Sequence, residues 1–161
     1  MSKGWSHEGK PFDPSYEELK DWQCFVYIIT DDTGRSYVGV KQFHKKVTRP
    51  PLKGRRNKRR SIAESDWKSY VGSSPALQEK VRQESTSVLQ RREILHLCRT
   101  KGDGALLEAM EQIQRGVLWR DDYYNEIINL RTHSKHLSDE LKEKLRNDYG
   151  TTEGHNEDGT L

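Results

Sequence analysis

Two tyrosines ten residues apart, Tyr27 and Tyr37, lie in segments 24–30 and 35–40, which have the composition of strands. β-Branched and aromatic residues dominate both segments, and the turn signal Asp31-Asp32-Thr33-Gly34 separates them, so we predict a β-hairpin. Because side chains alternate across a strand, both tyrosines lie on one face of this hairpin if the turn is a three-residue loop centred on Thr33.

The face that carries the tyrosines also carries Gly39 and Lys41, whereas valine and isoleucine side chains form the opposite face. If the turn is a three-residue loop centred on Thr33, Tyr27 lies across from Tyr37, whereas a four-residue loop would break this phase. A glycine leaves room for a backbone or a phosphate group to approach the strand. The face could therefore bind phosphate; the alternative is a tyrosine pair that serves packing alone.

Ten Lys or Arg and no acidic residue occupy segment 41–60, although the net charge of the chain is only +3. Such a block is either a solvated loop or the electrostatic footprint of a phosphate-rich partner, and we favour nucleic acid. Pro50-Pro51 and Gly54 interrupt the segment, so we predict a loop. Cations at this density would release several counterions from a duplex, which makes binding steeply salt-dependent.

The pair of tripeptides in the hairpin resembles the GIY-YIG motif of GIY-YIG endonucleases. The second tripeptide, Tyr37-Val38-Gly39, matches the family pattern well. The first departs from it, because Phe25 and Val26 precede Tyr27 where the family has Gly and Ile, and this puts the catalytic competence of the first half in doubt.

A second stretch extends the resemblance. Residues 67–74, followed by Leu77, are similar to the W-x-x-Y-x-G-S-S-x-x-L stretch of the phage-encoded, homing-endonuclease-like branch of the family. The resemblance covers roughly residues 22–130. It implies the GIY-YIG nuclease fold and a metal-dependent endonuclease acting on double-stranded DNA.

The resemblance implies one divalent cation, Mg²⁺ or Mn²⁺, held by a glutamate on the helix after the third strand. Glu108 and Glu111 are the two candidates, and the spacing to Asn125 favours Glu108 as the metal ligand. We expect Glu111 to point outward and to be solvated. The alternative is that both are surface acids, the usual fate of helix glutamates. One carboxylate binds Mg²⁺ weakly, so water and substrate phosphate would complete the coordination.

The resemblance implies that one of the two tyrosines activates water, and we favour Tyr27 as the base and Tyr37 as a positioning donor. A free tyrosine has a pKa of about 10, so it needs help at neutral pH. Lys41 and Arg49 are the cations expected to lower that pKa and to contact the scissile phosphate. Arg49 stands near the place of the family's catalytic arginine, whose fork can hold two phosphate oxygens.

Other polar residues are interpreted as contacts to the DNA backbone. For His44 we weigh a proton shuttle against an exposed, idle histidine, and favour the idle one. Asn125 either closes the domain by hydrogen bonding near the site or is a turn residue. The DNA-binding set that we predict is Gly39, His44, Lys45, Lys46, Arg55, Arg56, Lys58, Arg59, Arg60, Ser73 and Asn125.

Local patterns predict the elements that position these residues. A third strand fits residues 91–98, and helices fit 75–84, 103–115 and 139–146, with Ser74, Asp103 and Ser138 as their caps. The inner face of the second helix is expected to carry Leu106, Met110 and Ile113. Strand, strand, helix, strand, helix, helix is the order of an α+β domain: a small three-stranded antiparallel or mixed sheet flanked by helices.

Composition sets the limits of this domain. Only 32% of the 161 residues are hydrophobic and 33% are charged, so the core is small. We divide the chain into a polar lead-in (1–20) with a helical turn at 15–20, a nuclease domain (21–130), and a charged helix with a disordered tail (131–161). No apolar run could cross a membrane. With two cysteines interpreted as reduced thiols, we expect a cytoplasmic protein, in the host cytoplasm if phage-encoded.

We therefore predict a metal-dependent DNA endonuclease of the homing type. Two other classes stay open: a non-catalytic nucleic-acid-binding module on the same fold, and a regulatory protein that docks a partner through its charged C-terminal helix.

Overall fold

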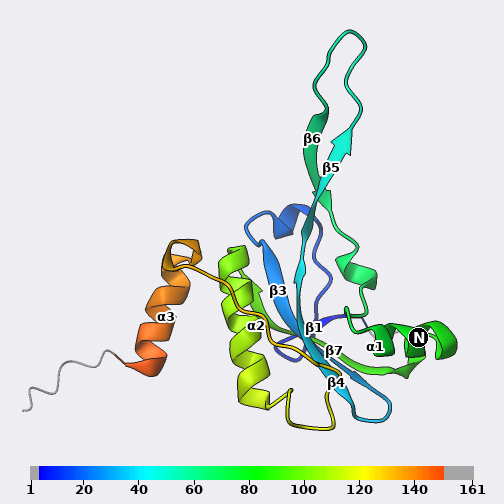
Figure 1. Ribbon diagram of the computed structural model, residues 1–161, viewed down its shortest axis with the longest axis vertical. Coiled ribbons are helices and arrows are strands. Elements are labelled where there is room, and N and C mark those ends of the chain that lie inside the picture. The colour runs from blue at the N-terminus through cyan, green and yellow to red at the C-terminus, as the bar shows by residue number, and fades with distance from the viewer. Residues whose placement is uncertain (1–3, 151–161) are drawn as a thin grey trace, which may run out of the picture.

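A computed structural model describes residues 4–150 (Figure 1). It contains a mixed five-stranded sheet of order β2-β1-β7-β3-β4. The strands are β1 (Ser6–His7), β2 (Lys10–Pro11), β3 (Cys24–Asp31), β4 (Ser36–Gln42) and β7 (Leu89–Cys98). The predicted α+β class is confirmed, but the sheet is larger than the predicted three strands.

The two extra strands come from the polar lead-in. β1 pairs in parallel with β7, and Trp5 beside it is buried against the rings of Phe25 and Tyr27. The burial of this large aromatic ring helps to hold a short, otherwise polar segment on the sheet. The 3₁₀ turn Glu17–Leu19 confirms the predicted helical turn within residues 15–20.

The central hairpin β3–β4 has a three-residue loop, residues 32–34, one of the two loop lengths that the sequence left open, but this loop does not place Tyr27 across from Tyr37. Tyr27 lies opposite Gly39, and Tyr37 lies opposite Ile29. A loop centred on residue 33 pairs residues whose numbers add up to 66, so Tyr27 and Tyr37 are diagonal neighbours rather than partners. They still share one face, with ring centroids 6.3 Å apart.

Both faces of the sheet are covered, each by its own hydrophobic cluster. The tyrosine face packs against Trp5, Phe43, Trp67 and Leu77, and Leu77 comes from α1 (Pro75–Glu84). The valine and isoleucine face packs against α2 (Lys101–Arg115) and α3 (Asp139–Tyr149). The cysteines Cys24 and Cys98 are buried and free, as predicted.

The helices begin close to where capping signals place them. Ser74 caps α1 and Ser138 caps α3, both as predicted. The cap of α2 is Thr100 rather than Asp103, whose carboxylate instead accepts hydrogen bonds from the backbone and hydroxyl of Ser138. Asp103, which the sequence predicted as a helix cap, therefore links α2 to α3.

The predicted inner face of α2 is confirmed for Leu106 and Met110, which pack against the core, and is wrong for Ile113. Ile113 is 53% exposed, whereas Gly104, Leu107 and Gln112 are buried. A Cβ at Gly104 would lie 2.6 Å from the Cys24 sulfur, so this helix face touches the sheet directly. Polar residues on this face of α2 form hydrogen bonds to the strands. A hydropathy pattern alone does not predict that such residues face the sheet.

The basic segment is also different from the prediction, because it forms a second, two-stranded sheet rather than a loop. β5 (His44–Arg49) pairs with β6 (Arg59–Glu64), and the two strands stand away from the rest of the molecule (Figure 1). The prolines and Gly54 that indicated a loop are confined to the turn between the strands.

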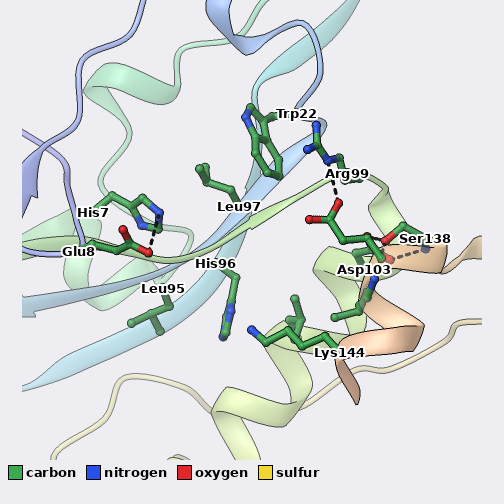
Figure 2. Close-up of a pocket in the computed structure, with 13 residues that line it drawn as sticks. His7, Glu8, Trp22, Leu95, His96, Leu97, Arg99, Asp103, Ser138 and Lys144 are labelled. Atoms are coloured by element: carbon green, nitrogen blue, oxygen red, sulfur yellow. Dashed lines mark hydrogen bonds and ion pairs between the residues drawn. The ribbon is translucent and has the colours of Figure 1, made fainter. Parts of the chain in front are cut away.

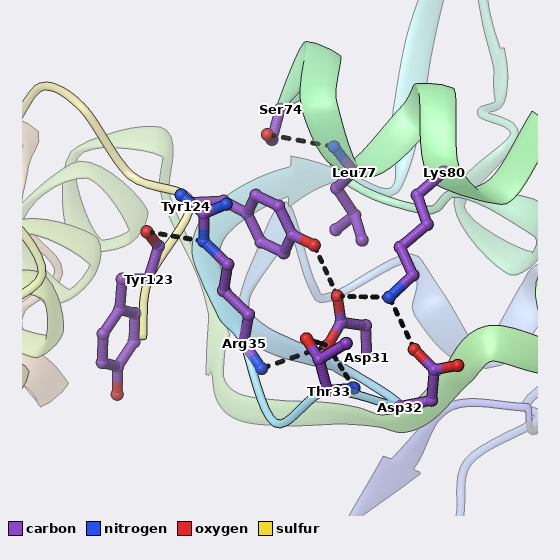
Figure 3. Close-up of polar contacts among 9 residues, drawn as sticks. All are labelled: Asp31, Asp32, Thr33, Arg35, Ser74, Leu77, Lys80, Tyr123 and Tyr124. Carbon is purple, nitrogen blue, oxygen red and sulfur yellow. Dashed lines mark hydrogen bonds and ion pairs between the residues drawn. The ribbon is translucent and has the colours of Figure 1, made fainter. Parts of the chain in front are cut away.

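The β3–β4 turn is fixed by the buried carboxylate of Asp31 (Figure 3). It accepts the backbone N–H groups of Thr33 and Arg35 at 2.9 and 3.1 Å, the Lys80 ammonium of α1 at 3.1 Å, and the Tyr124 hydroxyl. Burial opposes ionisation, but these hydrogen bonds hold the pKa of Asp31 well below its usual range. The network ties the hairpin to α1 and to the segment after α2.

No helix within residues 4–150 is both long and apolar enough to span a bilayer. The predicted disorder of the acidic tail falls on residues 151–161, outside the described residues.

Candidate active site

Two side-chain amides hold the free backbone edge of β4. Asn125 accepts the Val38 N–H at 3.0 Å and donates to the Val38 carbonyl at 2.7 Å. Gln112 of α2 donates to the same carbonyl at 3.1 Å. Asn125 is only 8% exposed, so it positions the edge and does not face a substrate phosphate.

Tyr27 is fully buried, and its hydroxyl points at Gly39. A Cβ at position 39 would lie 2.5 Å from the Tyr27 hydroxyl oxygen and 2.9 Å from Cε1 of Tyr37. The glycine therefore makes room for two phenol rings. Among the described residues, the Tyr27 hydroxyl has no hydrogen-bond partner. Such buried unpaired groups are rare in folded proteins, and catalytic function is one of the recognised explanations.

Tyr37 is half-buried, and its hydroxyl forms a 2.6 Å hydrogen bond with Ser73. Ser73 directly precedes the cap of α1, so α1 and β4 together orient this phenol. Tyr37 is the more accessible of the two tyrosines and also borders a pocket of about 520 Å³ that Asn125 and Ser74 help to line.

Lys41 is the cation that the fold places beside the tyrosines. Its ammonium lies 4.0 Å from the centroid of the Tyr70 ring and forms a 2.6 Å ion pair with Asp66. The Tyr70 ring in turn stands edge-on to Tyr27, with centroids 5.9 Å apart. The aromatic contact and the ion pair fix this charge next to the phenols.

Glu108 reaches the same edge of β4 from α2. Burial raises the pKa of its carboxyl to about 7, and this rise is opposed only by the Gln112 amide, 3.3 Å away, and the Val40 backbone. Glu108 also acts electrostatically on both Tyr27 and Tyr37. No Lys or Arg within residues 4–150 contributes to the pKa of this carboxyl, so the carboxylate lacks a compensating cation.

The tyrosines have higher pKa values than predicted. Burial, reinforced by Tyr70, Tyr37 and Glu108, raises the pKa of Tyr27 well above 10, and burial likewise raises the pKa of Tyr37. We expected nearby cations to lower both values. Desolvation of the phenolate outweighs any such help, because a charged ring in this aromatic core would lose its hydration.

The fold thus gathers two phenols, a glycine, a cation and a helix glutamate at one hairpin. One comparison with known protein families adds to these observations. Residues 5–128 match a family model described as "Putative endonuclease segE, GIY-YIG domain". The chain belongs to the GIY-YIG endonuclease family. Searches of curated proteins and of solved structures found no match. Membership implies nuclease chemistry and a nucleic-acid substrate.

The structure does not bring Arg49 to this GIY-YIG site. Arg49 is exposed at the far end of β5, five residues beyond His44, or about 17 Å along a strand. It therefore cannot tune the tyrosines as predicted. The remaining predicted backbone-binding cations are exposed on the same hairpin: Lys45, Lys46, Arg55, Arg56, Lys58, Arg59 and Arg60.

His44 lies at the base of the hairpin and is neither a free shuttle nor an idle, exposed side chain. One ring nitrogen lies 2.8 Å from the Trp22 carbonyl and the other 2.8 Å from the Tyr16 hydroxyl. Both nitrogens are therefore engaged, and the residue anchors β5 to the body of the GIY-YIG domain.

Glu111 is not the solvated residue that we predicted. Its carboxylate lies 2.7 Å from His96 and 2.9 Å from Arg115, and the His96 hydrogen bond is the main cause of its lowered pKa. A nearby pocket of about 380 Å³ between β7, α2 and α3 (Figure 2) contains His96 but neither tyrosine. Other polar groups there are already paired with one another, namely Arg99 with Glu140 and Asp103 with Ser138.

Tyr70 is the site residue that sequence reasoning missed, since it was not among the predicted site residues. It links Lys41 to Tyr27. Its place in the Trp67–Ser74 stretch, which resembled the family pattern, was the available signal.

Proposed function

We propose that this GIY-YIG chain is an endonuclease that hydrolyses phosphodiester bonds in double-stranded DNA with one divalent cation, Mg²⁺ or Mn²⁺. The observation that carries the proposal is the Glu108 carboxylate. It is half-buried and uncompensated, and it interacts electrostatically with both phenols of the GIY-YIG hairpin.

The donor set fits a hard cation. A carboxylate whose pKa is raised to about 7 by burial gains most from a positive charge brought to it. The described residues contain no group of three or more His, Cys, Asp or Glu side chains that could hold a metal ion, so Glu108 would supply the single carboxylate. Such a cation neutralises charge on the phosphoryl oxygens and assists the leaving oxygen.

The two phenols have different roles in this proposal. Tyr27 stays neutral because burial raises its pKa, so it is not the base; its fully buried hydroxyl lies against Gly39 and positions the β4 strand that carries Tyr37. Tyr37 is more accessible, and its hydroxyl is held by Ser73, so it is the phenol that orients the attacking water. This reverses the roles that the sequence favoured.

The remaining site residues bind and position. Lys41 supplies a fixed positive charge for the scissile phosphate. Gln112 and Asn125 hold the β4 edge so that Tyr37 and Glu108 keep their relative positions. A homing type, a phage origin and a cytoplasmic location stay predictions, the first two supported by the resemblance of residues 67–74 to that branch of the family.

Incubation of supercoiled plasmid with the full chain and MgCl₂ or MnCl₂ tests the proposal. We expect nicked or linear product with the wild type, and a loss of about 100-fold or more in Glu108→Gln. Glu111→Gln, one turn further along α2, is the matched control and should keep its cleavage rate. Equal cleavage by Glu108→Gln contradicts the assignment. Binding without any scission by the wild type would instead favour the non-catalytic module.

A further inference from the structure

The β5–β6 hairpin is strongly basic and, within residues 4–150, is held to the body of the domain only near its base, where His44 forms hydrogen bonds with Tyr16 and Trp22. Nine Lys or Arg lie between residues 44 and 60, and all nine are exposed. β5 and β6 pair only with each other, and Figure 1 shows them projecting from the body. A two-stranded ribbon without a third strand or a packed face is marginally stable alone, so another function must explain its retention.

One pair of facing cations within the ribbon opposes its folding. Arg49 lies directly opposite Arg59 in the β5–β6 ladder, and Thr48 lies opposite Arg60. Like charges facing each other across strands are destabilising. A polyanion bound along the ribbon removes this repulsion, whereas water and salt only screen it.

The base of the hairpin is packed into the aromatic core of the domain. Phe43 is fully buried, with ring centroids 4.8 Å from Phe25 and 5.3 Å from Trp67. The Phe43 carbonyl accepts the Ser65 N–H at 2.8 Å, and the Ser65 hydroxyl donates to the Gln42 carbonyl at 2.6 Å. Because Phe25 is two residues from Tyr27, the direction of the hairpin is fixed relative to the catalytic phenols.

We infer that residues 44–64 form an arm that lies in the major groove of duplex DNA beside the cut site. The inference rests on the proposed function for its substrate. The major groove admits a two-stranded β-ribbon, whereas the deep, narrow major groove of A-form RNA does not. The arm carries no Phe, Tyr or Trp, the residues on which single-stranded bases stack. Duplex DNA is the nucleic acid that fits both observations.

The length of the arm predicts how far it reaches. The β5 ladder from His44 to Arg49 spans about 17 Å, and the turn 50–58 extends beyond it. At 3.4 Å per base pair, the tip cations meet phosphates about 5 or more base pairs from the place where the arm enters the groove. The affinity for DNA should therefore fall when the duplex is shortened on the side of the cut where the arm lies.

The test measures binding by fluorescence anisotropy in EDTA, where cleavage is suppressed, with labelled 30-base-pair and 8-base-pair DNA duplexes. The tip variant replaces two lysines and two arginines of the turn by glutamine: Lys53, Arg55, Arg56 and Lys58. The control replaces two lysines and two arginines that are exposed outside the arm: Arg131, Lys135, Lys144 and Arg146.

We expect the tip variant to bind the long duplex at least about tenfold more weakly at low salt, and to lower the log–log salt slope by about 3. The control should change both quantities much less, and the short duplex should discriminate little between variants. Equal binding of the long duplex by tip variant and wild type overturns the inference, as does an equal loss on double-stranded RNA or single-stranded DNA. Because no cleavage is measured, failure of the proposed nuclease activity leaves this test intact.

Discussion

Replacement of Glu108 by glutamine should stabilise the metal-free protein at alkaline pH. The pKa of this carboxyl rises from 4.5 in the unfolded chain to about 7 in the folded one, because burial disfavours the carboxylate. Between pH 4.5 and about pH 7 the native state binds more protons than the unfolded state. The free energy of unfolding therefore falls as pH rises through this window, and the whole penalty is present above pH 7.

The size of the effect follows from the same values. At about 1.4 kcal/mol per pH unit, the ionised Glu108 lowers the free energy of unfolding by up to about 3 kcal/mol at pH 8. Glutamine has nearly the same shape and never ionises, so Glu108→Gln should differ from the wild type by less than about 1 kcal/mol at pH 5, which is only half a unit above the unfolded-state pKa of 4.5. At pH 8 it should be more stable by about 1–3 kcal/mol.

Urea denaturation in EDTA at pH 5 and pH 8, followed by tryptophan fluorescence, measures this difference. Glu111→Gln is the control with the opposite sign, because the pKa of Glu111 is lowered by His96 and Arg115. Its ionised form stabilises the fold above pH 4.5, so its loss should destabilise at pH 8. Addition of MgCl₂ at pH 8 should stabilise the wild type and leave Glu108→Gln unchanged. A Glu108→Gln variant that is less stable than wild type at pH 8 refutes the argument for an uncompensated carboxylate.

Three further substitutions probe the hairpin. Tyr27→Phe removes a buried hydroxyl without a partner among the described residues, so the free energy of unfolding should change by less than about 1 kcal/mol. Plasmid cleavage should nevertheless fall about 100-fold. A loss of stability together with the loss of cleavage would indicate a packing role. Gly39→Ala should destabilise by about 1–3 kcal/mol in denaturation, because its Cβ meets the Tyr27 ring, whereas Gly4→Ala has open space and should be neutral. Asp31→Asn should destabilise by about 2–3 kcal/mol at pH 7. The difference should be smaller at pH 3, because the unfolded chain, in which the Asp pKa is 3.8, then takes up a proton that the folded carboxylate does not; an equal loss at both pH values would exclude its charge as the cause.

Local sequence determined the elements that depend on neighbours in the chain. The strand segments around Tyr27 and Tyr37 followed from composition and turn residues, whereas the loop length, and with it their shared face, was left open until the register was known. The limits of α1 followed from Ser74 and Pro75, since a cap and a proline act within one helical turn. The family resemblance also pointed to Glu108 over Glu111.

The tertiary structure alone decided what depends on contacts distant in sequence. Trp5 brought a polar lead-in onto the sheet, and polar partners on the strands turned Gln112 of α2 inward. The basic segment looked like a loop, and only its register as a ribbon showed that Arg49 lies far from the phenols. Likewise, the ionisation of Tyr27 and Glu108 depends on the low-dielectric surroundings that packing creates. Spacing along a chain carries no information about such burial, because desolvation is a property of the assembled fold.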